Sequence, residues 1–379
     1  MSITVAVLKE TAAGERRVAL DPASTKKLAK RGFRMLVQAG AGDAAGFTDG
    51  QYSEAEILED AKAILADADI LLWVQAPAPE TIALMRKNSI GMGMAFAHRN
   101  PKLVSALNDR SISCLAMELV PRISRAQSMD VLSSQATVAG YKAVLRAATL
   151  APRLFPMLTT AAVTLRPARV VVIGAGVAGL QAIATARRLG ARVEAYDIRS
   201  AAREQVESLG AKMIDTGVNA EGEGGYAREL TDDEKQQQAE KLAEHLAVSD
   251  AVVSTAAIPG RPAPKIISRA MVEAMQPGSV IVDLAAESGG NCELTKPGET
   301  VTVGGVIVDG PLDLASQAAL HASEMYARNL VNLLDLLEKE EALEIDLEDE
   351  VVAGTLLTHN GELVHQQTAK ILGAEAGGD

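Results

Sequence analysis

The fold is decided by residues 169–199, which read RVVVIGAGVAGLQAIATARRLGARVEAYDIR. The β-branched run at 170–173 is typical of a buried parallel strand, and it ends in a glycine-rich turn at 174–179. Residues 180–189 have the composition of a helix, and Gly190 ends that helix. A strand, a glycine turn and a helix in this order are typical of a doubly wound α/β domain.

The three glycines of the turn have separate physical roles. Gly174 allows the tight turn, Gly176 lets a pyrophosphate approach the backbone, and Gly179 lets the helix pack closely. A second strand follows and ends directly before Asp197, which lies 18 residues after Gly179. That carboxylate can accept hydrogen bonds from ribose hydroxyls, and it repels a 2′-phosphate. The whole arrangement therefore predicts a bound dinucleotide, NAD(H) rather than NADP(H).

The composition excludes several classes of protein. A chain of 379 residues with 48% hydrophobic content can form two or three domains with full cores. Its formal net charge of −12 argues against nucleic acid or anionic lipid as a partner, because both are negatively charged. Cys114 and Cys292 show no disulfide pattern, as expected in a reducing cytoplasm. Neither a signal peptide nor an uninterrupted membrane span is apparent, so we expect no direct membrane insertion.

Strand-like and helix-like segments alternate along the chain, which predicts parallel sheets covered by helices. We therefore expect an α/β protein with two doubly wound, Rossmann-like domains and a cleft between them. Residues 1–133 and 318–379 are expected to form the first domain, and residues 134–317 the second. Long helices near 134–155 and 315–337 would connect the two.

Some local predictions are less direct. Residues 40–46 form a second glycine cluster, but its spacing is wrong by one for a nucleotide turn, so a plain loop is predicted. Residues 53–65 are predicted to be a helix, and residues 301–308 a strand. The Asn360-Gly361 pair predicts a hairpin near the C-terminal end.

A polar, poorly periodic stretch of sequence precedes the first long helix. The plain interpretation is a surface loop that ends in a helix N-cap. The functional interpretation follows from position, since ligands of such folds lie outside the strand ends, where a second domain can supply side chains. The candidates are Arg122, Arg125, Gln127, Asp130 and Ser133.

Two stretches of sequence carry a family resemblance. Residues 121–135 (PRISRAQSMDVLSSQ) and 177–186 (VAGLQAIATA) resemble the NAD(H)-binding component, or alpha subunit, of proton-translocating nicotinamide nucleotide transhydrogenases. The resemblance extends over essentially the whole chain and includes residues 205–210 (QVESLG), 224–227 (GGYA), 258–260 (IPG) and 289–292 (GGNC).

This resemblance implies a homodimer with NAD(H) held in the interdomain cleft. It assigns Arg122, Gln127, Asp130 and Ser133 to the nicotinamide and its ribose, with Gln127 nearest the ring that donates hydride. The other implied cofactor-binding residues are Ile123, Ser124, Arg125, Gly174, Ala175, Gly176, Val177, Gly179, Asp197, Ile198, Arg199, Gly225, Tyr226, Gln238, Thr255 and Ala257. Among these, Tyr226 would belong to a mobile loop that closes over the cofactor, although a tyrosine among glycines is by itself more typical of a loop anchor.

The resemblance also implies an activity. The chain would be an NAD(P)+ transhydrogenase component of the Re/Si-specific type, active only with partner subunits, and it would pass hydride between NADH and NADP+. The NADP(H) site and the proton channel would lie on the partners. Membrane-spanning partners would hold this cytoplasmic chain at the inner membrane. The scattered histidines suggest no metal site.

A second family, alanine dehydrogenase, shares the N-terminal pattern. Residues 14–20 (GERRVAL) match both families, so Arg17 does not decide between them. An amino-acid dehydrogenase needs a cation for its substrate carboxylate and a general acid or base. Gln75 stands where that family has a lysine, and Glu287 where it has an aspartate, although His98 could match its histidine.

The incomplete acid–base equipment favours transhydrogenation. Hydride transfer between two nicotinamide rings needs proximity, alignment and exclusion of water, but no proton donor. A soluble alanine dehydrogenase-like oxidoreductase stays the second hypothesis. A noncatalytic NAD(H)-sensing module is the third, and it would bind NADH without transferring hydride to any partner.

Overall fold

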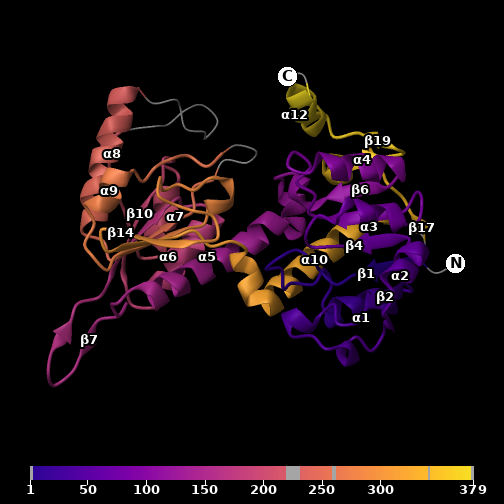
Figure 1. Cartoon of the computed structure of the whole chain (residues 1–379), viewed down its shortest axis with the longest axis horizontal. Helices are drawn as coiled ribbons and strands as arrows, with labels where there is room; N and C mark the ends of the chain where they lie inside the picture. Colours follow the sequence, from indigo (N-terminus) through magenta and orange to yellow (C-terminus); the bar gives the residue numbers. More distant parts are fainter. Residues whose placement is uncertain (1–2, 219–230, 258–261, 340–341, 377–379) are drawn as a thin grey trace. The chain divides into compact units, whose positions relative to one another are not determined.

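The computed structural model of the chain describes residues 3–218, 231–257, 262–339 and 342–376. Its contacts divide into two compact units, Met1–Gln135 with Ser316–Asp379, and Ala136–Ala315. Each unit contains one large sheet flanked by helices (Figure 1). The architecture confirms the predicted α/β class with two Rossmann-like units.

The first unit has an eight-stranded sheet. Its strands are, in spatial order, β19 (Glu362–Leu363), β18 (Leu356–His359), β6 (Ser113–Ala116), β5 (Ile90–Gly93), β4 (Ile70–Leu72), β1 (Thr4–Val7), β2 (Arg34–Gln38) and β3 (Glu56–Leu58). Neighbours from β6 to β3 pair in parallel, whereas β18 pairs antiparallel with β6. The strand order reverses between β1 and β4, as in a doubly wound sheet.

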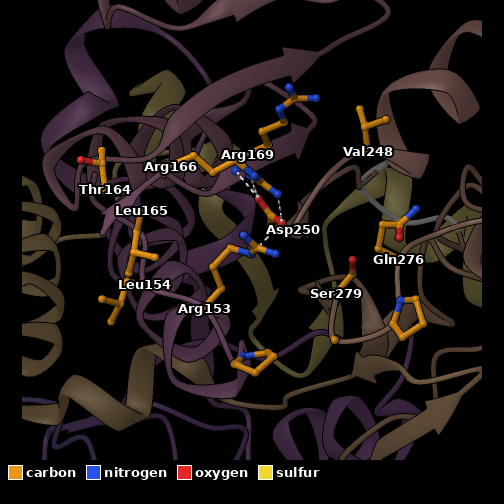
Figure 2. Close-up of a pocket in the computed structure, with 13 residues that line it drawn as sticks. Arg153, Leu154, Thr164, Leu165, Arg166, Arg169, Val248, Asp250, Gln276 and Ser279 are labelled. Carbon is orange, nitrogen blue, oxygen red and sulfur yellow. Dashed lines mark hydrogen bonds and ion pairs between the residues drawn. The ribbon is translucent and has the colours of Figure 1, made fainter. Parts of the chain in front are cut away.

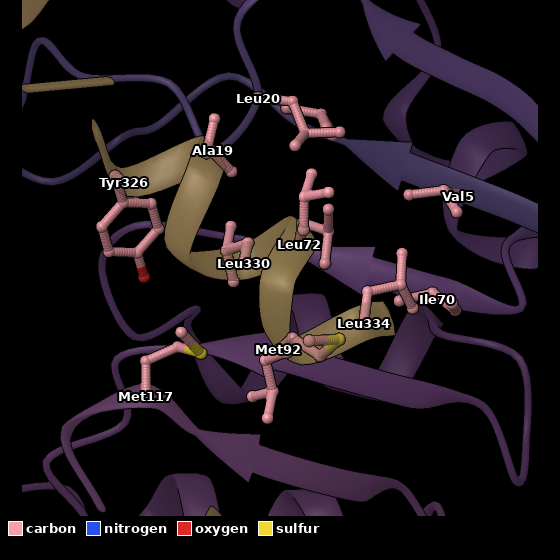
Figure 3. Close-up of a cluster of buried hydrophobic side chains, with 14 of the residues drawn as sticks. Val5, Ala19, Leu20, Ile70, Leu72, Met92, Met117, Tyr326, Leu330 and Leu334 are labelled. Atoms are coloured by element: carbon pink, nitrogen blue, oxygen red, sulfur yellow. The ribbon is translucent and has the colours of Figure 1, made fainter. Parts of the chain in front are cut away.

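The helices of the first unit cover both faces of its sheet. They are α1 (Pro22–Lys30), α2 (Ala61–Asp67), α3 (Pro79–Leu84), α4 (Pro101–Asp109), α10 (Ala319–Leu337), α11 (Glu350–Thr355) and α12 (Gln366–Ala376). On one face Leu330 and Leu334 of α10 pack with Val5 and Leu72 of the sheet, all essentially inaccessible to solvent (Figure 3). Helix α10, far along the chain, is therefore part of the core of the N-terminal sheet.

The second unit has a seven-stranded sheet. Its strands are, in spatial order, β11 (Lys212–Met213), β10 (Arg192–Tyr196), β9 (Arg169–Ile173), β12 (Ala251–Ser254), β13 (Val280–Asp283), β15 (Val306–Asp309) and β14 (Thr300–Val303). The helices are α6 (Val177–Arg188), α7 (Ala202–Ser208), α8 (Asp232–Ala247) and α9 (Arg269–Glu273), and α5 (Val131–Leu150) precedes them. The strand order reverses between β9 and β12, so the glycine turn that follows β9 lies at the switch point.

Alternate residues of β9 face the two helical layers of this unit. Val170 and Val172 belong to the cluster that contains Ala182 of α6. Val171 and Ile173 belong to the opposite cluster, with residues of α8 and α9. A strand buried on both faces explains the uninterrupted β-branched run in the sequence.

Two local predictions are wrong. The predicted helix at 53–65 is instead the short strand β3 followed by α2, because β3 extends the sheet beside β2 and the Asp60 carboxylate caps α2 through Lys62 N (2.9 Å). The predicted strand at 301–308 is the antiparallel pair β14 and β15. Gly304 and Gly305, with φ of +59° and +83°, form the turn between them, and both conformations favour glycine.

Four smaller features complete the comparison of the structure with the local predictions. The predicted loop at 40–46 is confirmed and contains only a 3-10 turn at Asp43–Ala45. The predicted hairpin at Asn360-Gly361 is confirmed by the β18 and β19 pairing. Two strand pairs were not expected, β7 (Leu158–Thr159) with β8 (Thr164–Leu165), and β16 (Glu338–Lys339) with β17 (Ala342–Leu343).

Candidate functional site

The glycine turn after β9 is held in a tight conformation. Gly174 has φ of +89°, which favours glycine, and its N–H donates to the carbonyl of Tyr196 (2.7 Å) at the end of β10. Gly176 is the N-cap of α6, and the space where a side chain would stand is open. A Cβ added to Gly179 would overlap the carbonyl oxygen of Gly174. The helix therefore begins as close to the turn as a backbone allows.

Helix α6 presents an uncapped N-terminus at the switch point. No side chain in the described part of the chain caps it, so the N–H groups of its first turn are left for a ligand. The Thr255 hydroxyl, just after β12, donates to the carbonyls of Gly174 (3.0 Å) and Ile173 (3.1 Å) and so fixes the turn from the other side. Unpaired N–H groups and a helix dipole at a fixed turn suit a pyrophosphate.

Asp197 lies directly beyond β10 and reaches back to the turn. Its Oδ2 accepts from the N–H of Ala175 (2.7 Å), and the Arg199 guanidinium binds both of its carboxylate oxygens. Burial by itself raises the pKa of Asp197, but the hydrogen bonds from Arg199 and from the backbone outweigh it and hold the pKa below its usual range. The carboxylate is therefore ionised, as ribose binding requires.

The remaining predicted residues of the second unit differ in their exposure to solvent. Gln238 on α8 is buried and accepts a hydrogen bond from the Tyr196 hydroxyl (3.0 Å), which ties α8 to the end of β10. Val177 and Ile198 are exposed beside the turn, and Ala257 is exposed beyond β12. Gly225 and Tyr226 lie outside the described residues.

The polar loop of the first unit is a 3-10 helix at Ser124–Met129, labelled η4. Ala126 and Met129 anchor it in the core. The carbonyl of Ser128 accepts hydrogen bonds from Asn329 (2.8 Å) and Asn332 (2.9 Å) of α10. The loop is therefore an ordered element, fixed by its core side chains and by the hydrogen bonds from α10.

Two of the predicted nicotinamide residues contact one another. The Asp130 carboxylate accepts from the Ser133 N–H (2.9 Å) and hydroxyl (2.6 Å) in the first turn of α5. Arg125 instead forms a two-bond ion pair with Asp349 (2.7 Å for each bond). The hydrogen bonds from the Arg125 guanidinium lower the pKa of Asp349 to about 2, against the opposing effect of desolvation. Arg122, Ser124 and Gln127 are exposed, whereas Ile123 is half-buried.

A buried polar network lies in the first unit, near the point where the strand order reverses between β1 and β4. The sequence did not predict that its residues meet. The Arg17 guanidinium is 4% exposed and donates through Nε and Nη2 to Glu15 (2.8 and 2.5 Å) and through Nη1 to Gln135 (2.9 Å). The Gln75 amide donates to the same Glu15 carboxylate (2.8 Å). The only sequence signal was the GERR motif, because Gln135 is distant in the chain.

A cavity of about 810 Å³ opens at the other edge of the second sheet, where β9, β12 and β13 begin. Figure 2 shows Arg153 and Arg166 reaching the Asp250 carboxylate, which also accepts from the Arg169 N–H (2.8 Å). No local pattern in the sequence predicted this cluster. It lies at the amino ends of the strands, away from the glycine turn at their carboxyl ends.

Two other kinds of feature are absent from the described residues. Within ranges 3–218, 231–257, 262–339 and 342–376, no group of three or more potential ligands is arranged to hold a metal ion. In the same part of the chain, none of the helices combines the length and the apolar character that crossing a membrane requires.

The fold and the switch-point geometry define a dinucleotide-binding protein of the Rossmann class. Residues 6–139 match the family described as "Alanine dehydrogenase/PNT, N-terminal domain", and residues 143–366 match "Alanine dehydrogenase/PNT, C-terminal domain". The chain therefore belongs to the alanine dehydrogenase/PNT family, and NAD(H) binding is the property of this family that the site fits.

Known relatives from the transhydrogenase and alanine dehydrogenase branches of the family differ in their similarity to this chain. A protein of Rhodospirillum rubrum, named as the first part of NAD(P) transhydrogenase subunit alpha, is 46% identical over 374 residues, which cover 95% of this chain and 97% of that protein. A crystal structure of a transhydrogenase from Sinorhizobium meliloti has a TM-score of 0.87 at 45% identity and covers 95% of this chain and 100% of that one. Alanine dehydrogenase of Bacillus subtilis is 28% identical, with 98% and 95% covered. The similarity is higher to the transhydrogenase branch.

Proposed function

We propose that the chain is the NAD(H)-binding component of a proton-translocating transhydrogenase and that it exchanges hydride with NADP(H) held by a partner subunit. The observation that carries this choice is the closed network around Arg17. All three nitrogen positions of its guanidinium are engaged by Glu15 and Gln135, and Gln75 completes the network in place of a cation. No cation of this network is left to bind a substrate carboxylate, as an amino-acid dehydrogenase would require.

The proposed division of labour follows the geometry of each unit. In the second unit the uncapped start of α6 binds the pyrophosphate, and Asp197 binds the adenosine ribose. In the first unit Arg122, Gln127 and the Asp130–Ser133 pair serve the nicotinamide end. The bound NADH supplies the hydride, and these residues orient the ring and exclude water, so no proton donor is needed. The NADP(H) site and the membrane-spanning part belong to partner subunits, which hold this chain peripherally at the membrane.

We also propose a homodimer, with the β7–β8 hairpin as contact surface. Figure 1 shows this hairpin extending away from the sheet of its own unit. Its apolar side chains and those beside it are 41–64% exposed, and they are Leu154, Met157, Leu158, Val163 and Leu165. An apolar patch of this kind is typical of a protein interface. Met157→Glu with Val163→Glu is expected to shift the mass by light scattering from dimer to monomer, and Ile371→Glu on α12 is the matched exposed control.

The experiment for the main proposal mixes the purified chain with NADH and an NADP(H)-binding transhydrogenase component, and follows reduction of an NADP+ analogue. Parallel samples contain the chain alone with NADH, pyruvate and ammonium. Hydride transfer only in the mixture is expected. Turnover with pyruvate by the chain alone would identify an amino-acid dehydrogenase, and NADH binding without transfer in either sample would identify a sensing module.

A further inference from the structure

We propose that Arg199 sets the cofactor selectivity of this chain. Its guanidinium occupies the Asp197 oxygens that would bind the ribose, and once displaced it can bind a 2′-phosphate. The inference rests on the proposed NAD(H) site in the second unit. It concerns a property that the glycine turn does not determine, namely how strongly the site discriminates between NAD(H) and NADP(H).

The Asp197 carboxylate is saturated with hydrogen bonds from the chain itself. Oδ1 accepts from the N–H (2.8 Å) and the Nε (3.0 Å) of Arg199. Oδ2 accepts from the N–H of Ala175 (2.7 Å) and from Nη2 of Arg199 (2.9 Å). Two carboxylate oxygens offer about four acceptor positions in total, and all four are used. A ribose diol can therefore bind Asp197 only when one of these donors leaves.

Only the guanidinium is free to leave. The two backbone donors are fixed, since Ala175 is buried within the glycine turn and Arg199 N–H belongs to the chain directly after β10. The Arg199 side chain is 48% exposed, whereas the Asp197 side chain is 6% exposed. The arginine can rotate into solvent while the carboxylate stays in place. The guanidinium thus takes the position of the ribose hydroxyls until the dinucleotide displaces it.

The displaced guanidinium would stand where a 2′-phosphate projects from the ribose. Arginine binds phosphate through two parallel hydrogen bonds, and its charge does not depend on pH in the physiological range. A second cation, Arg203 on α7, is 49% exposed and, within the described residues, forms only long ion pairs, with Glu207 (3.7 Å) and Asp215 (3.9 Å). The end of β10 therefore carries cations that a 2′-phosphate needs, and the Asp197 carboxylate is the group that opposes it.

Selectivity should therefore depend on the pair rather than on Asp197 alone. Asp197→Asn removes the negative charge, keeps an acceptor for the Ala175 N–H and releases the guanidinium. We expect NADPH to bind at least tenfold more tightly to this variant than to the wild type, and NADH about tenfold more weakly. In Asp197→Asn with Arg199→Gln, most of the gain in NADPH affinity should disappear, because the guanidinium beside the ribose is removed and only Arg203 remains.

The test titrates the purified chain with NADH and with NADPH and follows nucleotide fluorescence. The variants are the two above, Arg199→Gln alone, and Arg192→Gln as a control that removes an exposed arginine from the amino end of the same strand. Arg199→Gln removes an exposed side chain and is expected to fold; its ratio of NADH to NADPH affinity should rise at least threefold. Melting temperatures check the fold of each variant.

Two results would overturn the inference. One is an Asp197→Asn variant that folds but binds NADPH no better than the wild type. Equal NADPH affinities of Asp197→Asn and of the double variant with Arg199→Gln would count in the same way. The other, which needs no change at Asp197, is an Arg199→Gln ratio equal to that of the wild type and of Arg192→Gln. A wild-type chain that binds neither dinucleotide would instead overturn the proposed function, so the two failures are distinguishable.

Discussion

Gly179, in the first turn of α6, lies so close to Gly174 that the carbonyl oxygen of Gly174 occupies the space a Cβ would need. Because this neighbour is backbone and its turn is fixed by Thr255, it cannot move aside. Gly179→Ala is expected to lower the free energy of unfolding by about 2 kcal/mol or more, as overpacking does, and to weaken NADH binding. Thermal unfolding and fluorescence titration measure the two effects.

Gly176→Ala is the matched variant, and it is expected to affect NADH binding but not stability. A Cβ at Gly176 meets no atom of the chain within 4 Å, and its φ of −81° suits any residue. We expect an unchanged melting temperature and an NADH affinity at least tenfold lower, because the methyl group would stand where the pyrophosphate approaches the backbone. Unchanged NADH affinity would show that the dinucleotide does not bind over this glycine.

The part of the site that is local in sequence could be predicted, and the part built by distant residues could not. The turn at 174–179 and the acid at 197 lie in one strand–helix–strand unit, so spacing alone positions them. The ion pair of Arg125 with Asp349 joins residues 224 positions apart, and no local pattern reports it. The same holds for Arg17 and Gln135.

The wrong local predictions have a related cause. Residues 53–65 contain good helix formers, but the three residues of β3 bond to the edge of β2, and this tertiary pairing overrides propensity. Residues 301–308 were predicted to be one strand because the apolar pattern continues through Gly304-Gly305. A glycine pair within such a pattern is a turn signal, and the hairpin could have been predicted from it.

Glu10, just after β1, should make stability depend on pH. Burial raises the pKa of Glu10 to about 7, against the hydrogen bonds from the N–H groups of Val74 and Gln75. A raised folded-state pKa means that the folded chain holds a proton that the unfolded chain releases near pH 4.3, so stability falls as pH rises to about 7. Between pH 5 and pH 8 the wild type should lose about 2–3 kcal/mol from this group.

Glu10→Gln isolates that contribution. Its free energy of unfolding, measured by urea titration, should change less with pH than that of the wild type, although the amide costs some stability at pH 5. Glu59→Gln, at an exposed glutamate, is the charge control and should follow the wild-type curve. Equal slopes for Glu10→Gln and the wild type would contradict the prediction.

Asp250 should stabilise the second unit without taking part in cofactor binding. Its side chain is 10% exposed, and the carboxylate binds Arg166 through two bonds, Arg153 through one and the Arg169 N–H. Asp250→Asn is expected to lower the free energy of unfolding by about 2 kcal/mol, since charged hydrogen bonds are lost at a buried group. Arg153→Gln, at a half-exposed partner, should cost much less. NADH affinity should stay within twofold in both, and a larger loss would mean that this edge of the sheet influences the cofactor.

Gln127 and Arg125 occupy the same 3-10 helix but should differ in function. Gln127 is exposed, whereas the Arg125 guanidinium is held by Asp349. Gln127→Asn shortens an unburied side chain, so the melting temperature should not change, while hydride transfer with the partner component should slow at least tenfold because a positioned contact with the ring is lost. Arg125→Gln breaks an exposed ion pair and should leave transfer within threefold of the wild type. A large loss in Arg125→Gln would mean that Arg125 leaves Asp349 to bind the cofactor, and normal transfer by Gln127→Asn would remove Gln127 from the proposed site.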